Sequence, residues 1–327
     1  MKHRLVACTP AVAVAVAVKG ALLLATIAVA GCGPDFAPYD RLTSLRILAV
    51  KSEPVAPAPG DTTTLSALVY TPPPADPAAV SYQWSWCPFV GTASAGYPCL
   101  ITEDQIPTMG GVPVPFDLGT NATATLPHNF DPQLLMAICD GMPGFPPPPD
   151  CREGFPVMVR VTVRTDSDEV TAVRPLKLLL AAPSAENVNT NPTIDGLLAT
   201  VAGEDKPLDS MVELLRRADN PIKAVVKPEM AQTYDGFDDE GNPAPMIRER
   251  LYLSWFVESG DLKFPRTSFN STTTTPFEEL LKNTWRPATT KDYPQHTATL
   301  YVILRDSRDG VGWLPMPGTT VTLGAAP

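Results

Sequence analysis

Apolar and polar residues alternate with a period of two along most of the chain after residue 42. The clearest example is residues 80–86, where Val80, Tyr82, Trp84 and Trp86 share one face and polar residues occupy the other. This pattern is typical of a half-buried strand in an antiparallel sheet. The same period predicts strands at residues 45–50, 62–70, 157–163, 170–180, 193–201, 222–226, 250–258, 297–305 and 319–323. In the first of these, Leu45, Ile47 and Ala49 are predicted on one face and Arg46, Leu48 and Val50 on the other.

Three short helices are expected among the strands, because each has a start signal of its own. The signals are Asp131 as a cap with Pro132 after it, and the capping boxes Ser210/Glu213 and Thr275/Glu278. The predicted helices cover residues 131–138, 210–218 and 276–283.

Two regions repeat one plan. Residues 42–182 and 192–327 each have an early apolar strand, a middle strand that carries tryptophan (Trp84 and Trp255) and a closing apolar hairpin. The polar residues 183–191 between them are the expected linker. This repeated order of strands predicts an all-β chain of two tandem immunoglobulin-like β-sandwich domains with short inserted helices.

The first 31 residues have the composition of a secretory signal. Positive residues begin the segment, apolar runs follow, and small residues lead to Cys32. The order Val29-Ala30-Gly31-Cys32 resembles the bacterial lipobox. The resemblance implies cleavage before Cys32, a lipid on that cysteine, and a tether over residues 32–41 that holds the protein at a membrane. The alternatives are an uncut membrane anchor, which Lys19 would interrupt, and a plain signal with a chance cysteine.

The net charge of the chain after the signal limits the classes of partner that it can bind. Lys2, Arg4 and Lys19 lie in the signal, so residues 32–327 carry 22 basic and 35 acidic side chains, a net charge of −13. An acidic surface argues against nucleic acid as a partner.

Gly33 replaces the aspartate that retains enterobacterial lipoproteins in the inner membrane, so the resemblance to the lipobox implies an outer-membrane lipoprotein, periplasmic or surface-exposed.

Four cysteines remain after the signal and Cys32, which are Cys87, Cys99, Cys139 and Cys151. An even number in an exported chain predicts disulfides. The local pairs Cys87–Cys99 and Cys139–Cys151 each span twelve positions and are favoured, while crossed pairing stays open. A metal site is the third reading, but no Cys-x-x-Cys step or histidine pair supports it.

No catalytic site, cofactor site or metal site is predicted. His128 and His296 are the histidines that a Ser-His-Asp triad would need, and no nucleophile-elbow motif accompanies them. Glu249, Glu258 and Asp261 flank the Trp255 strand and could serve glycosidic cleavage only if two of them faced each other across a cleft.

Two further features have a structural and a functional interpretation. One loop, residues 234–245, is crowded with the oxygen-bearing side chains of Asp235, Asp238, Asp239, Glu240 and Asn242. A solvated connection is favoured over a calcium site, because the spacing is not that of an EF-hand. Two other tryptophans could stack on sugars, although packing under loops is the favoured use. These are Trp285 and Trp313.

Two stretches together resemble a known group of proteins. The group consists of uncharacterised predicted lipoproteins of myxobacteria. Its opening is resembled by residues 45–50 together with Pro59-Gly60-Asp61-Thr62 and Tyr82-x-Trp84. Its second half is resembled by residues 253–256 together with residues 302–306 and Gly310-Val311-x-Trp313. The Tyr82-x-Trp84 strand is also similar to that of PKD and other immunoglobulin-like modules. The resemblance implies immunoglobulin-like sandwiches on a lipid anchor and no known activity.

The sequence therefore predicts a lipid-anchored module of the cell envelope with a binding or structural role and no catalytic activity. Its membrane contact is the lipid on Cys32, and an envelope protein or a glycan is the expected ligand. The alternatives are an envelope hydrolase acting on glycan or ester bonds, and an accessory subunit of an envelope complex.

Overall fold

The computed structural model describes residues 38–73, 80–106, 114–209, 211–238, 241–270, 276–316 and 318–326. The chain divides into two compact units, residues 1–37 and 38–327, and every described residue belongs to the second. The predicted signal, Cys32 and the tether up to residue 37 lie outside the described residues. Among the described residues, no helix has the length and apolar character of a membrane span.

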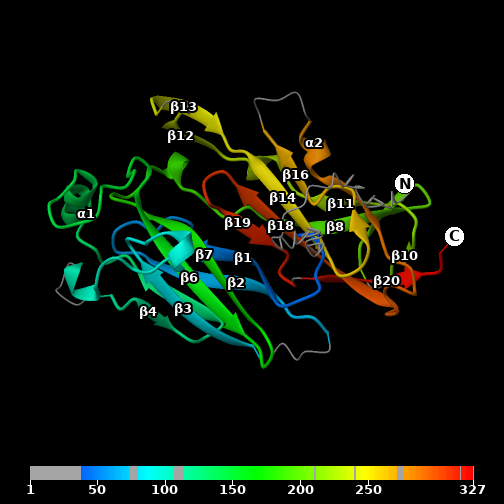
Figure 1. Ribbon diagram of the computed structural model, residues 1–327. Helices are drawn as coiled ribbons and strands as arrows, with labels where there is room; N and C mark the ends of the chain where they lie inside the picture. The colour runs from blue at the N-terminus through cyan, green and yellow to red at the C-terminus, as the bar shows by residue number, and fades with distance from the viewer. Residues whose placement is uncertain are drawn as a thin grey trace, which may run out of the picture. The chain divides into compact units, whose positions relative to one another are not determined.

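The first half of the described chain is a two-sheet sandwich (Figure 1). Its strands are β1 (Arg46–Glu53), β2 (Thr62–Tyr70), β3 (Ser81–Cys87), β4 (Asp117–Gly119), β5 (Thr123–Pro127), β6 (Phe155–Arg164) and β7 (Glu169–Leu178). One sheet has the order β1-β2-β5 and the other the order β4-β3-β6-β7. All of these pairings are antiparallel.

The second half is a larger sandwich. One sheet has the order β15-β17-β11-β8-β9, and the other has the order β10-β20-β18-β14-β16 with β19 beside β18. The strands are β8 (Gly196–Val201), β9 (Glu204–Pro207), β10 (Glu213–Leu215), β11 (Asn220–Val225), β14 (Leu251–Val257), β15 (Asp261–Leu262), β16 (Arg266–Phe269), β17 (Lys282–Arg286), β18 (Thr297–Asp306), β19 (Val311–Trp313) and β20 (Thr319–Gly324). Between β11 and β14 the chain forms a separate hairpin of β12 (Thr233–Phe237) and β13 (Pro243–Arg248).

The strand order makes both sandwiches immunoglobulin-like. In the first, β1, β2 and β5 occupy positions A, B and E, and β3, β6 and β7 occupy positions C, F and G. In the second, β8, β11 and β17 form the A-B-E sheet against β14, β18 and β20. Trp84 and Trp255 both lie at position C and are completely buried, as is the strand-C tryptophan of immunoglobulin domains. The predicted fold class is therefore confirmed.

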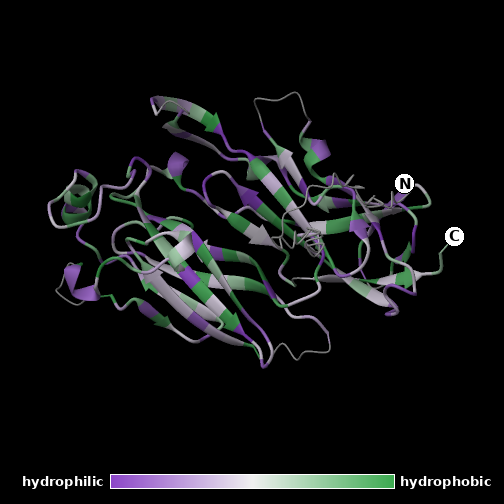
Figure 2. Ribbon diagram, viewed as in Figure 1, coloured by the Kyte–Doolittle hydropathy of each residue, from purple (hydrophilic) through white to green (hydrophobic). Residues whose placement is uncertain are grey.

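The alternation of the sequence explains which faces form the cores. On β6, Val157, Val159, Val161 and Val163 point into the first core with Trp84, and Figure 2 shows the matching change of colour along the strands. Because successive strand residues face opposite sides, this pattern specifies the register as well as the sheet.

The predicted helix at residue 131 is confirmed as α1 (Pro132–Cys139). The Asp131 side chain accepts a hydrogen bond from the Gln133 amide at 2.9 Å, and Pro132 is the first helical residue. The third predicted helix is shorter than expected. It is α2 (Phe277–Leu280), and β17 begins two residues after it ends.

The predicted helix over residues 210–218 is wrong. Residues 213–215 form β10, which pairs in parallel with β20 and buries Leu214. Arg216, expected near a helix end, is 3% exposed and donates to the backbone carbonyls of Ala288 and Tyr293. A nine-residue helix is marginal alone, so pairing with an open sheet edge outweighs its start signal. Ser210 and Thr275, the expected caps, lie outside the described residues.

The predicted faces of β1 hold up to Leu48 and are wrong for Ala49 and Val50. A register shift between Ile47 and Ala49 places Val50 in the first core and turns Ala49 and Leu48 toward the second sandwich. A bulge of one residue reverses the parity of every later side chain.

Candidate functional site

The two sandwiches pack against each other through the outer faces of two sheets. Leu48, Leu68 and Tyr70 on β1 and β2 meet Phe256 and Ile303 on β14 and β18. We call the whole group the central cluster: Leu42, Leu48, Ala49, Leu68, Tyr70, Phe256, Ile303 and Val311. The tandem domains are therefore stacked face to face, with a third apolar core between them.

Two partly buried arginines bond the two sandwiches together at the edge of the central cluster. Arg305 donates to the Leu48 carbonyl at 2.8 Å and to Ser254 Oγ at 3.0 Å. Arg174 on β7 donates to the carbonyls of Val50 and Asp309. Burial lowers the pKa of Arg305 to about 10. The arginines thus satisfy carbonyl groups of β1 that no strand partner covers.

The connecting segment, predicted as a linker over residues 183–191, is bonded to both sandwiches. The Asn191 amide nitrogen donates to the Ser52 carbonyl at 2.8 Å, and its oxygen accepts from the Val311 amide at 2.8 Å. The strand after β18, which is β19, also approaches the connecting chain closely, because a side chain on Gly312 would place its Cβ 1.7 Å from the Pro192 carbonyl oxygen. The junction is therefore closely packed on both sides.

A cavity of about 600 Å³ opens beside this junction. We call it the junction cavity. Its lining residues come from both sandwiches and from the connecting segment. They lie within residues 54–61, 151–154, 177–183, 187–189 and 234–237, together with Arg308. Junctions between domains are common places for ligand sites, and this volume is within the usual range.

The β12–β13 hairpin forms one wall of the cavity through Tyr234 and Phe237. The Arg308 guanidinium lies 4.2 Å from the Tyr234 ring centre, and the Arg152 guanidinium lies 5.5 Å from that of Phe237. Arg152 belongs to the first sandwich, so its contact holds the hairpin to the opposite wall. Such cation–π contacts add modest stability at exposed sites.

Behind Arg308 is a buried acidic pair. Glu249 is completely buried, lies 3.5 Å from Arg308 Nη1 and accepts from the Gln232 amide at 3.1 Å. Burial and the nearby Asp306 raise the pKa of Glu249 to about 7. Burial also raises the pKa of Asp306, whose Oδ2 has no partner among the described residues. This pair lies behind the cavity wall and does not line it.

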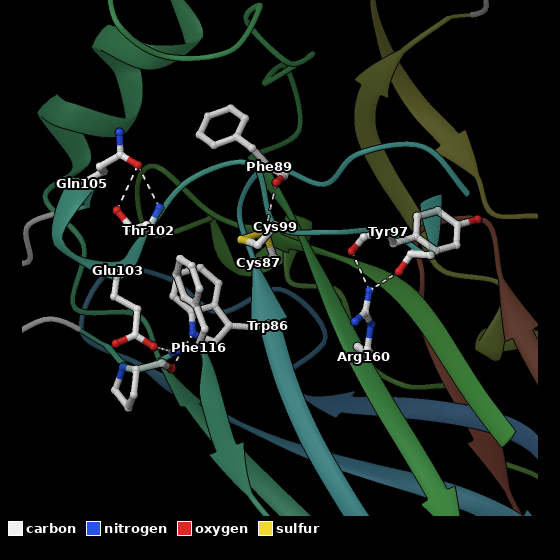
Figure 3. The surroundings of a disulfide bond; sticks show 12 residues. Trp86, Cys87, Phe89, Tyr97, Cys99, Thr102, Glu103, Gln105, Phe116 and Arg160 are labelled. Carbon is white, nitrogen blue, oxygen red and sulfur yellow. Dashed lines mark hydrogen bonds between the residues drawn. A yellow bond between two sulfur atoms is a disulfide. The ribbon is translucent and has the colours of Figure 1, made fainter. Parts of the chain in front are cut away.

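Both disulfides join the local pairs that the sequence favoured. Cys87–Cys99 closes one loop and Cys139–Cys151 the other, and no crossed pair is present among the described cysteines. Figure 3 shows the first loop, where Arg160 donates to the carbonyls of Gly96 and Tyr97 at 2.5 Å. Only Cys151 lines the junction cavity.

The two disulfides allow a matched test of the cavity wall. Each closes a loop of the same length, so removing either pair should cost about 2 kcal/mol of stability. We expect Cys139→Ala/Cys151→Ala to increase hydrogen exchange at residues 151–154, which line the cavity. Cys87→Ala/Cys99→Ala should leave those amides unchanged. Equal effects of the two variants would show that the second disulfide does not order the wall.

Within the part of the chain that the structure describes, neither of the two histidines that a triad would need is bonded to a hydroxyl or carboxylate. His128 is completely buried, its Nε2 lies 2.7 Å from the Leu179 carbonyl, and its Nδ1 has no partner among the described residues. Burial lowers the pKa of His128. His296 is exposed in the second sandwich. The described hydrogen bonds join neither ring to a hydroxyl or carboxylate.

The three candidate acids for glycosidic cleavage lie at the two ends of β14, and each has polar partners of its own. Glu249 precedes β14 while Glu258 and Asp261 follow it. The length of the strand therefore separates Glu249 from the other two acids by roughly 25–30 Å. Glu258 accepts from the Thr299 amide at 2.7 Å, and Asp261 pairs with Arg41. A two-acid mechanism needs a separation of about 5–10 Å.

The acidic loop is the turn of the β12–β13 hairpin. Asp238 accepts from the Asn242 amide at 2.7 Å and Asp235 from the Met246 amide at 3.0 Å. Asp239 and Glu240 lie outside the described residues, so the calcium hypothesis stays untested.

Trp285 and Trp313, the other candidates for sugar contact, pack against protein. Trp285 is completely buried and donates to the Ser259 carbonyl at 2.7 Å. Trp313 packs on the central cluster beneath Lys51, whose Nζ lies 4.8 Å from the ring centre.

Sequence reasoning missed the residues that form the cavity, above all Asn189, Tyr234 and Arg308. Each belongs to a loop or to an irregular hairpin, where no periodicity marks a face. A signal was available in the apolar run Leu179–Ala182 next to the asparagines 187, 189 and 191, since an ordered linker of this composition needs partners for its side-chain amides.

Comparisons with known proteins show little. No protein-family model and no curated protein matches the chain. Among solved structures, three N-terminal domains of the bacteriophage RB49 outer capsid protein Hoc match with 14% identity and a TM-score of 0.19, over 86% of this chain and 59% of that one. A chimeric titin Z1Z2 tandem matches with 11% identity and a TM-score of 0.25, over 86% and 100%. Murine CEACAM1b matches with 9% identity and a TM-score of 0.19, over 85% and 98%.

TM-scores this low carry no argument about this chain. The immunoglobulin-like assignment therefore depends on the strand order and on the two position-C tryptophans described above.

Proposed function

We infer that this protein is a lipid-anchored binding module of the cell envelope and that its ligand occupies the junction cavity. The observation that carries the proposal is the cavity itself. Its walls come from two sandwiches that the central cluster holds together. A site of this kind is preorganised, so little ordering opposes ligand binding.

The lining supports binding without catalysis. The residues that line the cavity include no serine, threonine or histidine, and the one cysteine, Cys151, is bonded to Cys139. Nucleophilic catalysis needs an activated nucleophile beside a base. The charged lining residues that remain are engaged in ion pairs and turn contacts.

The envelope location is supported by the two disulfides, which belong to an oxidising compartment. The proposed lipid on Cys32 would lie six residues before Pro38, within about 20 Å of it along an extended chain. Tyr39 packs on Phe256 with ring centres 5.7 Å apart and donates to the Pro265 carbonyl at 2.9 Å. Tyr39, in the described end of the predicted tether, therefore lies against the second sandwich.

Expression in a bacterial host tests the anchor. We expect the mature protein to begin at Cys32, to carry diacylglycerol on its sulfur and an acyl group on its amine, and to fractionate with membranes. Cys32→Ser should release it into the soluble fraction at unchanged stability. Intact-mass and peptide mass spectrometry give the readout, and an unmodified Cys32 in membrane-bound protein would contradict the assignment.

A further inference from the structure

We propose that the junction cavity binds a neutral, extended peptide segment with small aliphatic side chains. This inference rests on the proposed function and specifies its ligand class. Four features of the walls carry it: their apolar character, the pairing of their charges, one buried acceptor without a partner, and the cation that lies over each of the two aromatic rings.

The walls are rich in short aliphatic side chains. Ala56 and Ala58 come from the loop after β1, and Leu179, Leu180 and Ala182 come from the segment after β7. Methyl and methylene groups gain from contact with other apolar groups and cannot bond to hydroxyls. These walls therefore suit aliphatic side chains better than they suit the hydroxyl-covered surface of a sugar.

Each cation of the lining already has partners. Arg152 pairs with Asp150 at 2.6 Å and Lys177 with Glu153 and with Asp309, while Arg308 donates to the Asn187 carbonyl at 2.7 Å and lies over the Tyr234 ring. A phosphate or carboxylate on the ligand would have to compete with these pairs. The cavity is consequently best matched by a ligand without net charge.

One polar atom of the lining is buried without a partner among the described residues, and it is Asn189 Oδ1. The Asn189 amide nitrogen donates to the Arg308 carbonyl at 2.6 Å, which fixes the side-chain orientation and leaves the oxygen as an acceptor. A buried acceptor needs a donor. A backbone N–H of a bound peptide would supply one, while the peptide side chains contact the aliphatic walls.

The aromatic residues argue against a glycan. Sugars bind to open ring faces, but Tyr234 has Arg308 stacked on one face and Phe237 has Arg152 near its ring. These rings are engaged in holding the hairpin to the cavity. The peptide interpretation requires no rearrangement of either contact.

The experiment is a selection of phage-displayed random heptapeptides on residues 32–327 carrying Cys32→Ser. Selected sequences are then synthesised with acetylated and amidated ends and titrated calorimetrically. Chitotetraose is the parallel glycan probe, and phosphorylated and acidic peptides are the charged probes.

Two variants test the site. Ala182→Trp would fill the cavity and should abolish binding, and Asn189→Leu removes the orphan acceptor and should weaken binding about tenfold. Ala95→Trp is the control, because Ala95 is exposed within the Cys87–Cys99 loop and does not line the cavity. Circular dichroism establishes that each variant is folded.

The expected result is selection of uncharged, aliphatic peptides whose binding survives Ala95→Trp and is lost in Ala182→Trp. Selection of charged peptides, or chitotetraose binding that Ala182→Trp abolishes, would overturn the ligand class and leave the cavity as the binding site. If no probe binds, or binding is insensitive to Ala182→Trp, the peptide proposal is wrong. Peptide binding elsewhere would also contradict the proposed function of the cavity.

Discussion

Ile303→Ala should destabilise the protein by about 2–5 kcal/mol, although Ile303 lies on the outer face of its own sandwich. The side chain is completely buried in the central cluster, where it meets β1 and β2 of the other sandwich. Shortening it leaves a gap between two sheets that cannot close without separating the halves. Urea unfolding followed by tryptophan fluorescence measures the loss.

The variant should also change how the protein unfolds. In the wild type the central cluster couples the sandwiches, so they should unfold in one transition. Once the coupling is weakened, the first sandwich, reported by Trp84 and Trp86, and the second, reported by Trp255, should separate into two transitions.

The neighbouring residue provides the control. Leu304 is equally buried, but it points into the core of the second sandwich. Leu304→Ala should cost a similar free energy but keep a single transition, because it leaves the central cluster intact. If Ile303→Ala costs less than about 0.5 kcal/mol, as an exposed position would, the face-to-face packing is wrong.

This packing explains where sequence reasoning succeeded and where it failed. Strands such as β3 and β6 have one buried face in a simple sandwich, so their period of two specified strand, face and register. Strands β1 and β18 are buried on both faces, and in each the apolar residues fall on both parities: Ile47-Leu48-Ala49-Val50 and Tyr301-Val302-Ile303-Leu304. Such runs are typical of strands buried on both faces, and they were available as a sign of the third core.

The candidate site was not predictable in the same way. Tyr234 and Asn189 are 45 positions apart. They line one cavity only because the packing of the two sandwiches brings the β12–β13 hairpin close to the segment after β7. Local patterns carry no information about such a juxtaposition. The capping-box signal before residue 213 failed for a related reason, since the open edge of β20 lies more than 100 residues away.

The buried Glu249 predicts an unusual pH dependence of stability. An unfolded glutamate ionises near pH 4.5, whereas the folded pKa of Glu249 is about 7. Between these values the folded state retains a proton that the unfolded state has lost, so the residue destabilises the fold progressively as the pH rises. Below pH 4.5 both states are protonated and the effect vanishes. Above pH 7 it reaches a plateau of about 3 kcal/mol.

Glu249→Gln should therefore become more stable relative to the wild type by about 3 kcal/mol between pH 4.5 and pH 8. The glutamine carbonyl can still accept from the Gln232 amide, and Arg308 retains its bond to the Asn187 carbonyl at 2.7 Å. Urea unfolding of both proteins at half-unit pH steps gives the difference, in which the contributions of titrating groups that do not interact with Glu249 cancel.

Glu249→Ala separates the charge from the contact. It also abolishes the titration but leaves the Gln232 amide without its acceptor, so it should be less stable than Glu249→Gln by a constant amount at every pH. Both variants should show the same slope against the wild type. A flat difference between wild type and Glu249→Gln would mean that Arg308 keeps Glu249 ionised in the folded state, and that the acidic pair behind the cavity wall is charged at neutral pH.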